Sequence, residues 1–179
     1  MATVSDTIAG AGTTTLLYGD MPTRYRGGGQ WTDTFRTRGR FGPNQYAGPG
    51  DSVAVAIDNN GNCISVRVDH GNLFSRVGLI DPIDKEVIWG IDIEFDSGTA
   101  ASISLDNDAN CIDVHTDSGK LFYRLGKLDV TNKVIEWQAI NGYGTGDQNS
   151  VALADYGAAI EVHTAGNQLY YQVLPRQIR

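Results

Sequence analysis

CIDVHTDSGKLFYRLG, residues 111–126, occurs three times along the chain in recognisable form. The upstream copy is CISVRVDHGNLFSRVG at 63–78, and the downstream copy is AIEVHTAGNQLYYQVL at 159–174. The copies are 48 residues apart, and the same interval separates Trp89 from Trp137. A repeat of this length predicts a domain made by copying one supersecondary unit.

Each copy reads as four short strands. The middle two lie within the sixteen-residue stretch. The first precedes it as SVAVAI at 52–57, SISL at 102–105 or SVALA at 150–154. The fourth follows it as EVIWG at 86–90 or KVIEW at 133–137. These runs are rich in β-branched and aromatic residues, which favour strands.

Alternation within the runs predicts one buried face and one solvent-facing face for each strand. In the second strand of the first copy, Ile64 and Val66 fall on one side, while Ser65 and Arg67 fall on the other. Hairpin turns are expected between the runs, because their dipeptides supply the positive φ angles of tight turns. These dipeptides are Asn60-Gly61, Gly71-Asn72 and Ser118-Gly119.

The whole chain, 1–179, is predicted to be a single all-β repeat domain. Clear copies span 50–98, 99–147 and 148–179, and residues 1–49 align in phase as a divergent copy. About four 48-residue, four-stranded repeats indicate a β-propeller. A β-trefoil or a three-sheet prism with an N-terminal extension is the alternative. Because the last copy stops before its fourth strand, ring closure would need either an N-terminal strand, Thr3–Ala9, or a second chain in a homo-oligomer.

Composition and charge restrict the partners. The net charge of −7 argues against nucleic acid as a general partner, since phosphate contacts need clustered Lys and Arg. Five arginines within residues 1–50 are interpreted as a solvated surface. No window is apolar enough for a membrane span. No signal peptide is recognised at the N-terminus, which fits a cytoplasmic protein, a non-classically secreted protein or a mature form alike, and the sequence does not choose between these localisations.

The repeats resemble tandem repeats of bacterial secreted and toxin-associated proteins, which follow a pattern close to SVAL, VVEVH, LWYRVG and ITWG. NSVALAD, IEVHTAGNQLYYQV and VIWG carry the resemblance, which covers roughly residues 52–174. It implies a propeller-like binding module, more distantly similar to propeller lectins with one site per blade. The first clear copy departs at Arg67, where the others have His115 and His163, and at Ser75, where they have Tyr123 and Tyr171.

Two features that could suggest reactive or metal-binding chemistry have simpler explanations. Cys63 and Cys111 share a repeat position with Ala159, so they are expected to be small core residues. The loops starting at Asp58 and Asp106 resemble calcium loops, but a strand separates their first and twelfth positions. We therefore interpret both as hairpin turns, and we expect neither a metal nor a cofactor.

The candidate binding residues are polar and aromatic side chains that recur between copies. Histidine, carboxylate and arginine would bond sugar hydroxyls, and an exposed tyrosine would face the apolar C–H side of a sugar ring. The predicted carbohydrate-binding set is Arg67, Arg76, His115, Asp117, Tyr123, Arg124, His163 and Tyr171.

No catalytic motif is present, since H-E-x-x-H, G-x-S-x-G and a phosphate-binding loop are all missing from the sequence. The sequence thus predicts a non-enzymatic, multivalent lectin with one shallow site per repeat and glycans as partners. An interaction or structural module of a toxin or larger assembly is the alternative. A hydrolase on the same scaffold is the third possibility.

Overall fold

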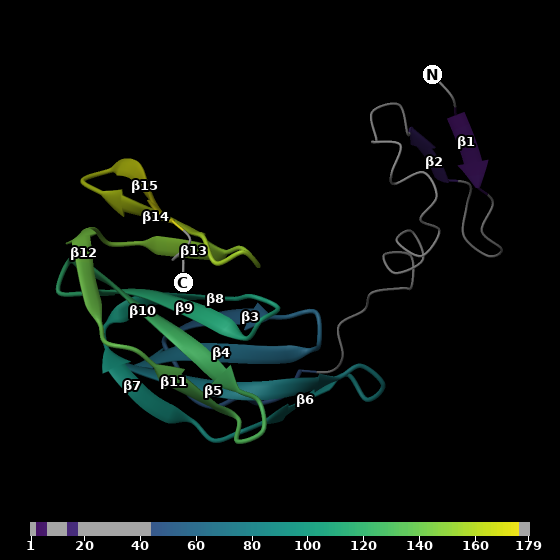
Figure 1. Ribbon diagram of the computed structural model, residues 1–179, viewed down its shortest axis with the longest axis horizontal. Coiled ribbons are helices and arrows are strands. Elements are labelled where there is room, and N and C mark those ends of the chain that lie inside the picture. Colours follow the sequence, from purple (N-terminus) through teal and green to yellow (C-terminus); the bar gives the residue numbers. More distant parts are fainter. Residues whose placement is uncertain (1–2, 7–13, 18–43, 176–179) are drawn as a thin grey trace. The chain divides into compact units, whose positions relative to one another are not determined.

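The computed structural model describes residues 3–6, 14–17 and 44–175, which form strands and turns and contain no helix. The chain divides into two compact units, Met1–Phe41 and Gly42–Arg179 (Figure 1). In the first unit, β1 (Thr3–Asp6) pairs antiparallel with β2 (Thr14–Leu17). The described residues therefore include no apolar helix that could span a membrane. The prediction of an all-β protein is confirmed.

The first sheet of the larger unit is an antiparallel meander with a divided outer strand. β3 (Ser52–Ile57), β4 (Asn62–Asp69) and β5 (Asn72–Asp81) follow one another in space as in sequence. β6 (Glu86–Trp89) and β7 (Ile93–Ser97) both pair with β5, at its two opposite ends. Between them, the Gly90 N–H donates to the Val77 carbonyl at 2.7 Å, so the two strands continue one line.

The second sheet repeats this arrangement, and the third repeats part of it. β8 (Thr99–Leu105), β9 (Asn110–Asp117) and β10 (Lys120–Asp129) form the second meander, with β11 (Val134–Trp137) and β12 (Asn141–Thr145) along β10. β13 (Asn149–Leu153), β14 (Ala159–Ala165) and β15 (Gln168–Leu174) form the third. Within the described residues, β15 has no outer strand.

The hairpin turns use positive backbone φ angles at the repeat positions expected for them. Gly61 (φ 83°) closes the β3–β4 turn, and Ser118 and Gly119 (φ 52° and 74°) close the β9–β10 turn. The β4–β5 turn differs by one residue from the prediction, because His70 and Gly71 (φ 51° and 81°) occupy it. Asn72 instead begins β5, opposite Asp69.

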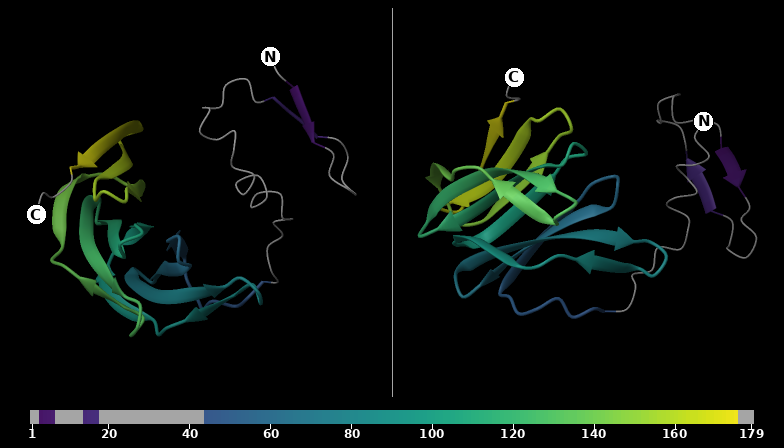
Figure 2. Two further views of the ribbon diagram at one scale, coloured as in Figure 1. Left: turned by 45° about the vertical axis from the view of Figure 1, so that its right-hand side comes forward. Right: turned by 60° about the horizontal axis from the view of Figure 1, so that its bottom comes forward.

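The three sheets stack on one another through repeated apolar faces. We call the side of a sheet turned toward the next sheet in sequence its back face, and the opposite side its front face. Ile64, Val66 and Val77 on the back of the first sheet pack against Ile103 and Leu105 on the front of the second. Ile112 and Val114 on the back of the second pack in the same way against Val151 and Ala159 on the front of the third. Within this unit, the sheets follow one another along an arc (Figure 2).

Stacking corrects the prediction of one solvent-facing side per strand. Six consecutive residues of β9, Cys111–Thr116, are buried, so both of its faces are covered. A strand between two neighbouring sheets loses its polar, exposed side, and its polar residues must find partners inside the protein. His115, expected on the polar face, is accordingly 0% exposed.

The predictions for the N-terminus fall largely outside the described residues. Only Thr3–Asp6 and Thr14–Leu17 of the divergent copy are described. The predicted closing strand Thr3–Ala9 is described as far as Asp6, and these residues pair with β2. The propeller, its trefoil or prism alternative, and the way a ring would close therefore all stay predictions.

Candidate functional site

A buried polar cluster joins the first and second sheets. His115 Nδ1 lies 2.6 Å from Asp113 Oδ2, and His115 Nε2 lies 3.8 Å from Asp96 Oδ2. Arg124 Nε is 2.9 Å from the same Asp96 oxygen. Antiparallel register places Arg124 beside Asp113 and Phe122 beside His115, whose rings stack at 5.8 Å. Because Asp96 belongs to β7, the cluster spans the boundary between the sheets.

The burial and the charge pairing of this cluster are typical of residues that hold two sheets together rather than of residues that contact a ligand. Burial raises the pKa of Asp113, and the hydrogen bond with His115 opposes that rise. Asp113 and His115 are each 0% exposed, so solvent and ligands have no access to them in this structure. A buried carboxylate is tolerable because a histidine and an arginine surround it.

The boundary between the second and third sheets also contains a buried histidine that pairs with a carboxylate and stacks on an aromatic ring. Glu161 lies 3.0 Å from His163 Nδ1, and the His163 ring stacks on Tyr170 at 5.7 Å. Tyr143 from β12 meets the His163 ring edge-on at 6.4 Å. Burial, together with the adjacent Glu161 carboxylate, raises the pKa of the Tyr143 hydroxyl. Gln172 occupies the repeat position of Arg124.

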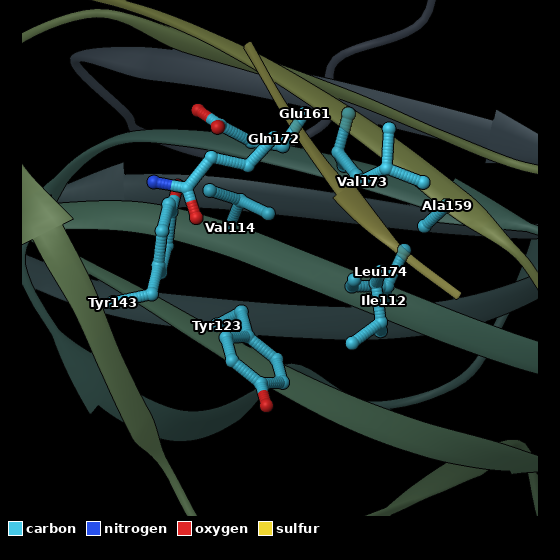
Figure 3. Close-up of a pocket in the computed structure, with 10 residues that line it drawn as sticks. Ile112, Val114, Tyr123, Tyr143, Ala159, Glu161, Gln172, Val173 and Leu174 are labelled. Carbon is cyan, nitrogen blue, oxygen red and sulfur yellow. The ribbon is translucent and has the colours of Figure 1, made fainter. Parts of the chain in front are cut away.

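A small cavity lies at this second boundary. Figure 3 shows Tyr143, Glu161 and Gln172 along one side of it with Val114 beside them, and Ile112, Val173 and Leu174 on the other side. Its volume of about 80 Å³ is far below the roughly 300–1,000 Å³ of small-molecule sites. The cavity has room for a few waters but not for a sugar ring.

On the front of the first sheet, two arginines lie flat against aromatic rings. The Arg67 guanidinium sits 4.3 Å from the Phe74 ring centre, and the Arg76 guanidinium sits 4.2 Å from that of Trp89. Asp92 lies 3.5 Å from Arg67 Nη2 and 3.9 Å from Arg76 Nε. Stacking and ion pairing together hold both cations in fixed orientations.

A wider groove lies between the β8–β9 turn and the β13–β14 turn. We call it the inter-sheet groove, with a volume of about 1130 Å³. Leu125, Leu153, Gly126 and Gly157 are among its lining residues. The side chains that give it chemistry are Asp108, Asn110, Lys127, Gln138, Asp155 and Tyr156. Tyr156 is 64% exposed, so its ring is available to a ligand.

Side-chain hydrogen bonds fix the turns that border the groove. Asp106, 2% exposed, accepts from the Asp108 and Asn110 backbone N–H groups at 2.9 and 2.8 Å, and from Asn110 Nδ2 at 2.8 Å. Asn107 Nδ2 donates to both carboxylate oxygens of Asp155 at 2.9 Å. These bonds confirm the interpretation of the Asp106 loop as a hairpin turn, and they hold Asp155 at the rim.

The predicted binding residues fall into separate places. Arg124 and His115 meet through Asp96, and Arg67 meets Arg76 through Asp92. The remaining members do not join them. Asp117 lies at the end of β9 with the Ser118 hydroxyl donating to it, His163 is buried on a front face, and Tyr123 and Tyr171 lie on back faces. A carbohydrate-binding role for these residues stays a prediction.

The residues lining the inter-sheet groove were not among the predicted ones. Tyr156 and Asp155 lie in the turn of the third copy, which lacks the Asp–Asn pattern of the other two turns. The sequence pattern therefore does not indicate a site in this turn. A signal is nevertheless present: Asn59, Asn107 and Asp155 are 48 residues apart, and each donates to or accepts from the next.

Both cysteines behave as the repeat positions predict. Cys63 and Cys111 are free and buried, at 2% and 1% exposure. Burial raises the pKa of both thiols, which keeps them protonated and unreactive at neutral pH. The core interpretation is confirmed.

Comparison with known proteins adds no functional assignment, since the chain matches no protein-family model and no curated protein.

Proposed function

We propose that the three stacked sheets are consecutive blades of a β-propeller, and that the protein is a non-enzymatic carbohydrate-binding module, a lectin. The inter-sheet groove is the proposed principal site. The observation that carries the proposal is the combination, at one groove, of an exposed Tyr156 ring with the carboxylates of Asp108 and Asp155.

The chemistry of the groove matches that of a sugar. A pyranose presents an apolar C–H face and a rim of hydroxyl groups. The Tyr156 ring offers a flat apolar surface of the right kind, and carboxylates accept strong hydrogen bonds from hydroxyl groups. The Gln138 amide can donate and accept. The Asn110 amide already donates to Asp106 and accepts from Lys127, and Lys127 also donates to the Asp108 carbonyl, which leaves one of its three N–H groups for a ligand.

The sites on the repeats are expected to be unequal. The corresponding place between the first and second sheets has Asp108 where the inter-sheet groove has Tyr156, and Leu79 where it has Lys127. It therefore lacks the aromatic platform. Multivalency would then arise from one stronger site with weaker copies, or from several chains together.

The alternative is a protein-interaction or structural module of a toxin or larger assembly. The exposed apolar side chains of the first and third sheets favour it, because contiguous apolar surface marks interaction sites. Such a module would bind without any requirement for Tyr156 or its neighbours.

A glycan array with the full chain tests the proposal, followed by titration of the best glycan against variants. Tyr156→Ala should weaken binding by about tenfold, because the stacking surface is lost. Tyr156→Phe should retain most of the affinity, since the ring remains. Ile83→Ala, at an exposed turn position far along the chain, is the control. Absence of any bound glycan, or equal binding by Tyr156→Ala, would contradict the groove assignment.

A further inference from the structure

The back face of the third sheet is exposed, although the same face is buried on the other two sheets. In the first sheet, Ile64, Leu73 and Val77 are at most 1% exposed. Their repeat counterparts in the third sheet, Ile160, Leu169 and Val173, are 45%, 73% and 59% exposed, and Tyr171 on the same face is 71% exposed. This is an apolar surface of the kind that the chain elsewhere covers with a sheet.

The front face of the first sheet is exposed in the complementary way. Val53, Val55 and Ile57 are 76%, 70% and 54% exposed. The counterparts of the last two on the second sheet, Ile103 and Leu105, are 6% and 8% exposed because they pack against the back of the first sheet. Among the described residues of the larger unit, one back face and one front face are therefore left without a covering sheet.

Strand edges show the same mismatch. In the first two sheets, the residues just before the next sheet form the outer strand, β7 before β8 and β12 before β13. Residues 44–50 precede β3 but belong to no strand and are exposed throughout. Tyr46, at 89% exposure, lies one residue from the repeat position of Phe95, which stacks on Trp137 at 4.8 Å. β15, the strand that such a segment would extend, has no outer partner in the described residues.

We propose that a second copy of this chain covers both exposed sheet faces and supplies the missing outer strand. The front face of the first sheet of one copy packs on the back face of the third sheet of the other, and residues 44–50 pair with the free edge of the other copy's β15. The joint is the same front-to-back contact that the chain already makes twice within itself. This continuity is why the occupant is a second copy rather than an unrelated protein.

Geometry selects the number of copies. A front-to-back contact joins two different surfaces, so it either closes into a ring or continues as a filament. Propellers contain about four to eight blades. In the described residues of the larger unit, one copy supplies three stacked sheets, which is too few, and three copies would supply nine, which is too many. Two copies give a closed ring of six, and the predicted particle is a head-to-tail dimer of about twice 19.3 kDa.

This inference rests on the blade arrangement proposed above but not on carbohydrate binding. A monomer that binds glycans would overturn the dimer and leave the lectin proposal intact. A dimer that binds no glycan would do the reverse.

The test is light scattering of the full chain after size exclusion, with two charge-bearing variants. Val55→Glu damages only the front-face contact, and Val173→Glu damages only the back-face contact, because each places a charge in an apolar joint. Each variant alone should shift dimerisation by at least about a hundredfold in Kd. Ile83→Glu adds the same charge at an 86% exposed turn and should leave the dimer unchanged.

Mixing the two damaged variants distinguishes a head-to-tail joint from a symmetric one. The intact back face of Val55→Glu can still receive the intact front face of Val173→Glu, so the mixture should form a dimer at a concentration where neither variant does. Recovery in the mixture also shows that both variants are folded. Three outcomes would overturn the proposal: a monomeric wild type whose own residues 1–41 cover the faces, a trimer, or a mixture that stays monomeric.

Discussion

The side chain of Asn107 donates to both carboxylate oxygens of Asp155, 48 residues further along the chain. The same interval joins the Asn59 backbone N–H to Asn107 Oδ1 at 2.9 Å. Equivalent turns of successive repeats are thus in direct contact, so residues that are one repeat apart in the sequence are neighbours in space. This contact places Asp155 at the rim of the inter-sheet groove.

Removing a hydroxyl between adjacent inner strands should destabilise the stack. The Leu153 N–H donates to Ser104 Oγ at 2.9 Å across the boundary between the second and third sheets. Ser104→Ala leaves this partly buried donor without a partner and should lower the free energy of unfolding by about 1–2 kcal/mol. Chemical denaturation measures the loss. Ser97→Ala, at an exposed position, should change it by less than about 0.5 kcal/mol.

Gly126 should not accept a side chain. A Cβ at this position would lie 2.7 Å from the Ile135 Cγ2 and 2.8 Å from both Cys111 Sγ and Trp137 Cε3. Gly126→Ala should therefore cost about 1–3 kcal/mol through overpacking, seen as a lower thermal midpoint.

The matched control for that substitution is Gly142→Ala. Its Cβ would come no closer than 3.4 Å to the Phe122 ring, which is a contact that a small shift accommodates. Equal destabilisation by both alanines would show that the backbone, and not the packing between β10 and β11, sets the cost.

The contribution of Asp58 to the free energy of unfolding should depend on pH. Burial acts to raise the pKa of Asp58, but hydrogen bonds from Asn62 and Asn60 outweigh it, and the pKa falls below its ordinary value of 3.8. A carboxyl group with a lowered pKa stabilises the folded state above its unfolded pKa. That stabilisation is lost as the pH falls through the folded value.

Asp58→Ala should therefore cost about 1–3 kcal/mol near pH 7, since four donor groups of Asn60 and Asn62 lose their acceptor. The difference from the wild type should shrink below about pH 4. Denaturation curves between pH 3 and 7 measure it, with the exposed Asp84→Ala as control. A difference that is constant across this range would refute the role of the charged carboxylate.

The sequence predicts local structure and periodicity well because both depend on neighbouring residues. Strand positions in the three clear copies follow from alternation and turn dipeptides, and the alanine at the position of Cys63 and Cys111 reveals a core site. The β4–β5 turn differs by one residue from the prediction because His70 adopts a left-handed conformation, whereas the Gly71-Asn72 dipeptide places the positive φ angles one residue later.

The binding surface was harder to predict because it depends on how sheets stack. Alternation in a single strand cannot show that a neighbouring sheet will cover the polar side, so His115 was expected at the surface and is fully buried. Nor can it show that Tyr156, in the least regular turn, lines a groove with residues of the preceding repeat. Both features come from contacts between copies rather than within one.

Cell agglutination tests most directly the claim that this scaffold presents several glycan-binding sites at once. The folded wild-type protein should agglutinate glycan-bearing cells, and millimolar free sugar of the bound type should abolish the effect. Tyr156→Ala should reduce the titre sharply. A well-folded preparation that agglutinates no cells and retains no glycan on an array would show that these stacked sheets serve some purpose other than binding carbohydrate.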